Sequence, residues 1–234
     1  MSPAHAWLNS TLRPLGIRIE RARPKGWPVG NAAQSVTTLI DVGCAFGTPE
    51  FYALNQDASL LLIDPLAEYV PWMEKILARR PGKHAITALG AQAGEIELNV
   101  DLDAPTRSSA LSRTALTRTG GRIERRRVPV ATLDSLVDSL ELRPPFGLKI
   151  DTEGFELEVL RGATRMLAKS ELVIAEVSVL PRFERSYTFL ELLQYLDGVG
   201  FAIDRVLTAN RDPQGLIRFL DVAFIPKRER AGRS

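Results

Sequence analysis

Residues 36–47 read VTTLIDVGCAFG, a short apolar and β-branched run that is closed by Gly43. This composition is typical of a strand that is buried on both faces of a parallel sheet. A second run of this kind, SLLLID, occupies residues 59–64, and residues 48–55 leave room for one short helix between the two. The unit strand, helix, strand predicts a parallel sheet with a right-handed crossover.

The alternation of helices and strands continues towards the C-terminus. We expect helices at residues 67–80, 155–167 and 188–196, and strands at residues 84–88, 146–151, 171–177, 201–207 and 219–225. Residues 208–215, TANRDPQG, are rich in turn-forming residues, so the last two strands should pair antiparallel. The sequence thus predicts an α/β fold with a mostly parallel sheet that ends in an antiparallel hairpin.

The length and composition predict one soluble globular domain. The chain has 234 residues, of which 45% are hydrophobic and 25% are charged. We place this domain at residues 36–227. It is preceded by an irregular covering segment at residues 1–35, rich in Arg, Pro and Gly, and followed by a basic tail at residues 228–234.

The charge and cysteine content exclude several classes of protein. The net charge of +2 is too small to indicate a nucleic-acid partner, and the basic run RIERRR at residues 122–127 is interpreted as a solvated loop or strand edge. Cys44 is the only cysteine, so no intrachain disulfide can form. We find neither a signal peptide nor about 20 consecutive apolar residues, and therefore expect a cytoplasmic protein without a membrane partner.

Two glycines and two acidic residues indicate a nucleoside-binding crevice. Gly43 and Gly47 follow the first strand, at the carboxyl edge where open α/β sheets bind ligands. Asp64 ends the second strand, where a carboxylate can accept hydrogen bonds from both ribose hydroxyls. In an alternative interpretation, the glycines only turn the chain and Asp41 caps the following helix.

Dinucleotide binding is the main competing interpretation of this loop. Its fingerprint is G-x-G-x-x-G, whereas the spacing here is G-x-x-x-G, so the glycine that lets the pyrophosphate approach is absent. Asp41 would also place a negative charge close to the pyrophosphate. A carboxylate in this position suits a cationic amino group better, which favours a sulfonium nucleoside over a dinucleotide.

A second group of carboxylates follows the strand at residues 146–151. Asp151 and Glu153 lie in KIDTEGFE, residues 149–156, at the edge of the sheet that faces the same crevice. Either can take a proton from a hydroxyl group during a reaction, and Glu176 at the end of the next strand is a third candidate. Alternatively, Asp151 and Glu153 cap the helix that begins near Phe155, and Glu176 forms a surface salt bridge.

Four blocks of this sequence resemble the FkbM family of S-adenosylmethionine-dependent methyltransferases, over a span from Leu39 to Phe201. They are LIDVGCAFG at residues 39–47, IDP at residues 63–65, VATLDSL at residues 130–136 and LKIDTEGFELEVLRGA at residues 148–163. The resemblance implies a class I methyltransferase fold, which is a Rossmann-like three-layer sandwich whose seven-stranded sheet has an antiparallel last strand.

The resemblance also implies S-adenosylmethionine as the cofactor and O-methylation of a hydroxyl group on a sugar, glycan or natural product. We assign cofactor contacts to Asp41, Gly43, Cys44, Gly47, Asp64, Pro65 and Gly90. Cys44 can equally be a small buried thiol. The catalytic candidates are Asp151, Glu153 and Glu176. We assign no metal ligands, although two carboxylates so close together could hold a divalent ion.

The sequence departs from the pattern of the family at two positions. Ala45 stands where Asn is usual, and Asp64 stands where Glu is common. The loss of a polar side chain at Ala45 supports an alternative function, a catalytically inactive module that still binds the nucleoside. A nicotinamide-dependent oxidoreductase is the third hypothesis.

Overall fold

The computed structural model describes residues 27–117 and 120–231 of the chain. Most of the predicted N-terminal covering segment, residues 1–26, lies outside the described residues, as do residues 118–119 and 232–234. The described end of that segment contains one short 3-10 helix, η2 (Gly30–Ala33). At the other end, the predicted basic tail overlaps a helix, α8 (Lys227–Ala231).

The principal sheet has seven strands in the order β3-β2-β1-β7-β8-β10-β9. Their bounds are β1 Thr38–Val42, β2 Ser59–Asp64, β3 Gly82–Ile86, β7 Phe146–Ile150, β8 Ser170–Ser178, β9 Phe201–Arg211 and β10 Ile217–Pro226. Neighbouring strands from β3 to β8 pair parallel, whereas β10 pairs antiparallel with both β8 and β9. The predicted sheet and its antiparallel last strand are confirmed.

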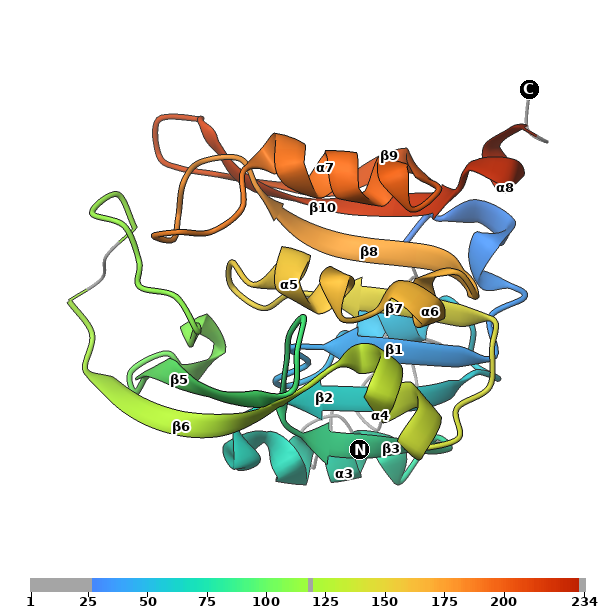
Figure 1. The fold of residues 1–234 in the computed structure, drawn as a ribbon, viewed down its shortest axis with the longest axis horizontal. Helices are drawn as coiled ribbons and strands as arrows, with labels where there is room; N and C mark the ends of the chain where they lie inside the picture. Colours follow the sequence, from blue (N-terminus) through green and yellow to red (C-terminus); the bar gives the residue numbers. More distant parts are fainter. Residues whose placement is uncertain (1–26, 118–119, 232–234) are drawn as a thin grey trace, which may run out of the picture.

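Helices cover both faces of this sheet. One face carries α4 (Leu133–Ser139), α5 (Glu156–Arg161), α6 (Thr164–Leu167) and α7 (Phe189–Gly198), which lie in front of the sheet in Figure 1. The other face carries η2, α2 (Pro49–Tyr52) and α3 (Val70–Leu77), with the 3-10 turn η3 (Ala67–Tyr69) leading into α3. Successive residues of a strand point to opposite faces, so Leu39 packs in one core and Ile40 in the other. This is the expected three-layer arrangement.

The helix predicted at residues 155–167 is interrupted. α5 ends at Arg161 and α6 begins at Thr164. A Cβ atom on Gly162 would lie 2.1 Å from the carbonyl oxygen of Gly90, so only glycine lets these two segments pack so closely. The break thus coincides with a close tertiary contact at a residue of low helix propensity.

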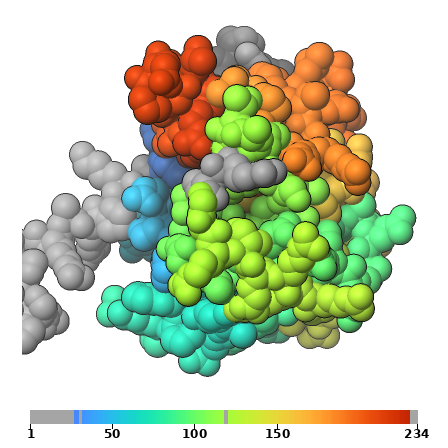
Figure 2. Space-filling view, turned by 90° about the vertical axis from the view of Figure 1, so that its left-hand side faces the viewer, coloured from blue at the N-terminus to red at the C-terminus, as the bar shows by residue number. Residues whose placement is uncertain are grey.

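A second, three-stranded sheet was not predicted from the sequence. It has the order β4-β6-β5, formed by β4 (Ala88–Leu89), β6 (Ile123–Ala131) and β5 (Gly94–Asp101). The predicted strand at residues 84–88 is in fact divided between β3 and β4. The small sheet lies beyond the carboxyl ends of β1, β2 and β3 in Figure 1, and Figure 2 shows that residues from about 95 to 131 cover much of this side.

Arg122 lies just before β6, and residues 123–127 of the basic run form the start of this strand, where it pairs with β5. Of the two predicted alternatives, a solvated loop or a strand edge, the structure has the strand edge. Most of its side chains are exposed, and several pair with acidic side chains nearby. These ion pairs are Arg122 with Asp103, Arg125 with Glu97, and Arg126 with Glu68 and Glu124. None of the helices that the structure describes is long and apolar enough to cross a membrane.

Candidate active site

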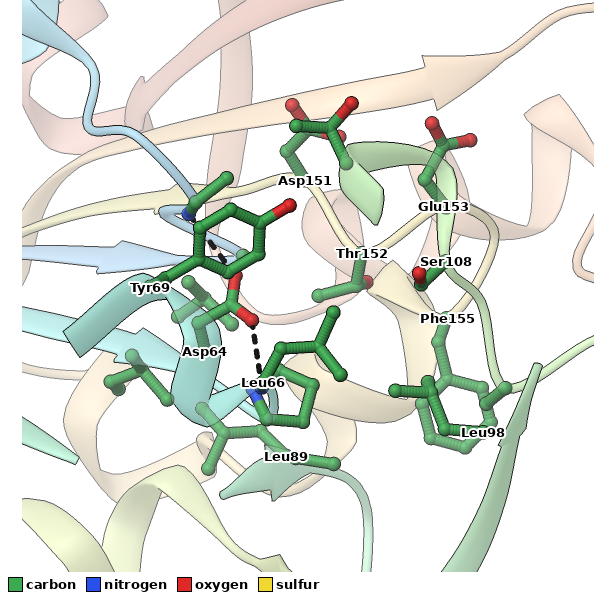
Figure 3. A pocket seen from close by; sticks show the side chains of 18 of the residues that line it. Asp64, Leu66, Tyr69, Leu89, Leu98, Ser108, Asp151, Thr152, Glu153 and Phe155 are labelled. Carbon is green, nitrogen blue, oxygen red and sulfur yellow. Dashed lines mark hydrogen bonds between the residues drawn. The ribbon is translucent and has the colours of Figure 1, made fainter. Parts of the chain in front are cut away.

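A pocket lies at the carboxyl ends of β1, β2 and β7. The lower part of the pocket in Figure 3 is apolar and is formed by Leu66, Leu89, Leu98 and Phe155. The upper part is polar and includes Tyr69, Ser108, Asp151, Thr152 and Glu153, with Asp64 between the two parts. A ligand with one apolar and one polar half matches this division.

Asp64 ends β2 and lines the pocket with a carboxylate that backbone groups hold in place. Its Oδ2 accepts a hydrogen bond of 3.1 Å from the N–H of Ala45, and its Oδ1 accepts one of 3.0 Å from the N–H of Leu66. Each carboxylate oxygen can accept more than one hydrogen bond, so lone pairs remain for a ligand. Burial raises the pKa of Asp64 to about 6, although these backbone hydrogen bonds act in the opposite direction.

The loop after β1 is shaped by the backbone of the acidic loop that follows β7. Gly43 has a φ of +71°, and a Cβ atom there would lie 1.8 Å from the carbonyl oxygen of Asp151. Glycine is required at position 43 because the backbone of the loop after β1 packs directly against the backbone of Asp151, which leaves no space for a Cβ atom. From the sequence, Gly43 was interpreted either as part of a ligand-binding loop or as a residue that only turns the chain, and the structure adds the close approach of the Asp151 backbone.

Asp41 lies beneath this loop rather than on the wall of the pocket. Its side chain is completely buried, and its Oδ2 accepts a 2.5 Å hydrogen bond from the hydroxyl of Tyr52. Its Oδ1 accepts no hydrogen bond from the residues that the structure describes but lies 3.5 Å from Nζ of Lys149. Asp41 and Lys149 are neighbours in the register of β1 and β7, which explains the contact. Asp41 therefore supports the loop from below.

Lys149 connects the two acidic sides of the site. Its Nζ lies 3.3 Å from Oδ2 of Asp151 and 3.5 Å from Oδ1 of Asp41. Burial by itself lowers the pKa of Lys149, but the charges of Asp41 and Asp151 outweigh burial and raise the pKa above its ordinary value. The ammonium group is therefore charged, and it holds the Asp151 side chain at the edge of the pocket.

Glu156 organises the acidic loop at residues 151–155. Its buried Oε1 accepts hydrogen bonds from the N–H groups of Thr152 and Gly154, at 2.8 and 3.1 Å, and its Oε2 accepts one of 2.7 Å from the hydroxyl of Tyr187. Glu153 and Gly154 both adopt the left-handed region, with φ of +53° and +98°. Such a turn is unfavourable for Glu153 without support, and Glu156 supplies that support.

Glu153 is held by two guanidinium groups. Its Oε2 lies 3.2 Å from Arg113 and 3.4 Å from Arg182. Arg182 also forms a buried ion pair with Glu176. Burial raises the pKa of Glu153, while the two arginines act to lower it. Glu153 is thus part of an ion-pair network behind the pocket, even though it also lines the pocket wall.

The structure brings only some of the predicted site residues to one pocket. Those that line it are Gly43, Asp64, Pro65, Asp151 and Glu153. The others lie outside its lining: Asp41 and Cys44 are buried, Gly47 packs against Ile76, Gly90 packs against Gly162, and Glu176 pairs with Arg182. Among residues 27–117 and 120–231, no three His, Cys, Asp or Glu side chains are grouped so as to hold a metal ion.

Several residues of this site were not predicted from the sequence, among them Lys149, Glu156, Tyr69 and the two arginines that pair with Glu153, Arg113 and Arg182. Lys149 stands inside an otherwise apolar run, and a buried lysine needs an acidic partner, which was an available signal. Glu156 lies within the quoted acidic motif but was given no role. Tyr69 belongs to a segment with helical spacing, and nothing local distinguishes it. It reaches the pocket only through the tertiary fold.

The sequence of this chain matches a known protein family. The family model described as the methyltransferase FkbM domain matches residues 41–203, which is more than half of the chain. The match includes the loop after β1, Asp64 and the whole acidic loop. No curated protein matches the chain in sequence.

Several solved structures are similar to this chain. Precorrin-6y C5,15-methyltransferase from Geobacter metallireducens has 13% identity and a TM-score of 0.44, covering 81% of this chain and 80% of that one. A fibrillarin from Aeropyrum pernix with natively bound S-adenosyl-L-methionine has 11% identity and a TM-score of 0.47, covering 95% and 73%. A putative O-methyltransferase from Klebsiella pneumoniae has 13% identity and a TM-score of 0.42, covering 97% and 91%.

Proposed function

The chain belongs to the methyltransferase FkbM domain family and is an S-adenosylmethionine-dependent methyltransferase, and we propose that it methylates a hydroxyl oxygen of a sugar, glycan or natural product. The observation that carries the proposal is the position of Asp151. It lines the pocket on the side opposite Asp64, and its side chain is 35% exposed, so an acceptor can reach it. The cofactor supplies an electrophilic methyl group when it is bound.

The residues on the β2 side of the pocket fit the nucleoside of this cofactor. Asp64 offers acceptor lone pairs for the two ribose hydroxyls, because its backbone hydrogen bonds use only part of its capacity. Leu66, Leu89 and Phe155 form an apolar space for the adenine ring. The Asp64 carboxylate and this apolar space agree with the use of S-adenosylmethionine as the cofactor.

Asp151 is the best candidate for the general base. A hydroxyl oxygen becomes a better nucleophile as its proton is removed, and a carboxylate at hydrogen-bond distance can accept that proton. Lys149 holds Asp151 at the edge of the pocket. The pocket also aligns the reacting groups, which contributes to the rate by orientation alone.

Glu153 and Glu176 are less suited to this role. Arg113 and Arg182 pair with Glu153, and Arg182 also pairs with Glu176, so both carboxylates are engaged by guanidinium groups. Two positive charges beside Glu153 also disfavour a divalent cation between Glu153 and Asp151. We propose that Glu153 and Glu176 position the acidic loop.

The distribution of arginines supports a small-molecule or glycan acceptor rather than a nucleic acid. A nucleic-acid surface needs cations that are available to phosphate groups. In β6 and next to it, Arg122, Arg125 and Arg126 are instead paired with acidic side chains. We further propose that the protein acts in the cytoplasm.

The second candidate function is a nucleoside-binding module without activity. Ala45 favours it, because the side chain at this position contributes no polar contact. The backbone of Ala45 nevertheless donates to Asp64, so the support of the ribose site does not depend on a side chain at position 45.

The experiment that tests the proposal is an acceptor screen with isotope-labelled S-adenosylmethionine. Acceptors are offered in matched sets that differ only in a hydroxyl, amino or thiol group, and products are identified by mass spectrometry and NMR. We expect a labelled methyl ether from hydroxyl acceptors only. Products labelled on nitrogen or sulfur would overturn the O-methylation proposal. Cofactor binding without transfer to any acceptor would favour the inactive module.

A further inference from the structure

Tyr69 is a buried tyrosine on the wall of the pocket that the proposed chemistry does not use. It is the last residue of η3 and is only 3% exposed. Its ring packs edge-on against the ring of Phe46, with centroids 5.1 Å apart and an interplanar angle of 88°. Phe46 belongs to the loop after β1, so this contact fixes the Tyr69 ring against the loop.

The hydroxyl of Tyr69 is buried and has no hydrogen-bond partner among the residues that the structure describes. In Figure 3 the ring lies next to Asp64, and its hydroxyl points into the polar part of the pocket, towards Asp151. Buried polar groups in folded proteins nearly always have a partner. An unpaired hydroxyl on a pocket wall therefore indicates a partner on the ligand.

The hydroxyl acts as a hydrogen-bond donor at neutral pH. Burial raises the pKa of Tyr69 to about 12, and the charge of Asp64 acts in the same direction. The group therefore keeps its proton, and the most favourable partner is a negatively charged acceptor.

The other donors on this wall are largely committed. The hydroxyls of Thr87 and Ser108 donate to backbone carbonyls, and that of Thr152 donates to Glu156. No lysine or arginine is among the described residues that line this pocket. An anionic group of a ligand bound here can use backbone N–H groups, the hydroxyl of the exposed Thr106 or the hydroxyl of Tyr69. Of these two hydroxyls, that of Tyr69 is the one that is buried without a partner among the described residues.

The methionine half of the cofactor brings such an anion, its carboxylate. β1 lies between β2, which ends in Asp64, and β7, which precedes Asp151. With the ribose at Asp64 and the reacting methyl group directed towards Asp151, the methionine half therefore crosses the carboxyl end of β1. We propose that the hydroxyl of Tyr69 donates a hydrogen bond to the carboxylate of bound S-adenosylmethionine. The proposal concerns the cofactor alone and is independent of the acceptor.

The test is the affinity of Tyr69→Phe for two ligands that share the nucleoside. S-adenosylhomocysteine carries the amino-acid carboxylate, and 5′-methylthioadenosine lacks the amino-acid half. By isothermal titration calorimetry we expect affinity for S-adenosylhomocysteine to fall by ~10-fold, as for the loss of a hydrogen bond to a charged group. Affinity for 5′-methylthioadenosine should stay within about two-fold. Equal losses for both ligands, or no loss for either, would overturn the proposal.

A matched control and a second ligand pair make the test specific. Tyr195→Phe removes a hydroxyl that donates to the carbonyl of Leu160, so it should leave both affinities unchanged. Decarboxylated S-adenosylhomocysteine should bind the unmutated protein more weakly than the parent ligand does. In Tyr69→Phe the ratio between the affinities for S-adenosylhomocysteine and for its decarboxylated form should be ~10-fold smaller than in the unmutated protein. An unchanged ratio would contradict the assignment of the Tyr69 hydrogen bond to the carboxylate.

Discussion

Asp64 and Glu153 both line the pocket, but the protein holds their carboxylates in different ways. Asp64 is held by two backbone N–H groups, whereas Glu153 is held by the side chains of Arg113 and Arg182. Backbone dipoles fix a carboxylate without adding a full opposite charge, so Asp64 can still act on a ligand. In contrast, two guanidinium groups form ion pairs with Oε2 of Glu153, so this carboxylate is less available to a ligand. The difference separates a carboxylate that can bind a ligand from one with a structural role. Asp151, whose side chain pairs with Lys149, lies between these two cases.

The largest effect is expected from Asp151→Asn. If Asp151 is the base, the substitution keeps the shape but removes the proton acceptor, and turnover should fall by ~10² to 10⁴-fold. Affinity for S-adenosylhomocysteine should change by less than about three-fold. Both are measured on the same preparation, by steady-state kinetics and by calorimetry.

Glu153→Gln is the matched control for that prediction. It removes a charge that two arginines compensate, so we expect the free energy of unfolding to fall by about 1–3 kcal/mol. Turnover should fall much less than in Asp151→Asn. An equal or larger loss of turnover in Glu153→Gln would reverse the roles that we assign to the two carboxylates.

Asp64→Ala should weaken the binding of the cofactor. We expect the Kd of S-adenosylmethionine to rise ten-fold or more, because two hydrogen bonds to a charged acceptor are lost, at ~1.5 kcal/mol or more each. The melting temperature of the ligand-free protein is compared in parallel. An unchanged Kd would remove Asp64 from the cofactor site.

The raised pKa of Asp64 predicts that cofactor binding depends on pH. Ribose hydroxyls bind best to the ionised carboxylate, and with a pKa of about 6 only a small fraction is ionised at pH 5. The Kd should therefore rise by ~10-fold between pH 7 and pH 5.

The raised pKa of Asp64 affects folding stability in the opposite direction: low pH weakens cofactor binding but favours the folded protein. Because its pKa in the folded protein exceeds the ordinary value, its contribution to stability is present at low pH and is lost as the pH rises through about 6.

Calorimetry at several pH values tests this dependence. Asp64→Asn provides the control, since an amide does not titrate in this range. A pH dependence that persists unchanged in Asp64→Asn would assign it to another group.

The smallest effect is expected at Ala45, which has a φ of +41°. Glycine adopts this conformation more easily, so Ala45→Gly should stabilise the protein by about 0.5–1 kcal/mol in thermal or denaturant unfolding. The Kd of the cofactor should stay within about two-fold, because the backbone N–H that supports Asp64 is retained. Ala45→Asn tests the side chain separately, and tighter binding than in Ala45→Gly would show that the amide adds a contact.

The alternation of apolar runs and helical segments was sufficient to predict the principal sheet. Strands such as β1 and β7 are short apolar runs, which is the composition typical of strands buried on both faces of a parallel sheet. The carboxyl ends of parallel strands lie at the same edge of the sheet. The placement of Asp64, Asp151 and Glu153 around one pocket follows from that rule. The small sheet was missed although Ile96, Leu98 and Val100 alternate with polar residues in β5, which is a strand signal.

Other features of the site were decided by contacts between distant segments. Whether Asp41 faces a ligand or Lys149 depends on the register of β1 against β7, which are separated by about a hundred residues of sequence. Gly43 is needed where the backbone of Asp151 approaches, and Tyr69 reaches the pocket because η3 packs against the loop after β1. Local patterns fix which face of an element is apolar, since they depend only on the period of the chain. They do not fix which side chain of another element occupies the space opposite, because that depends on packing across the whole fold.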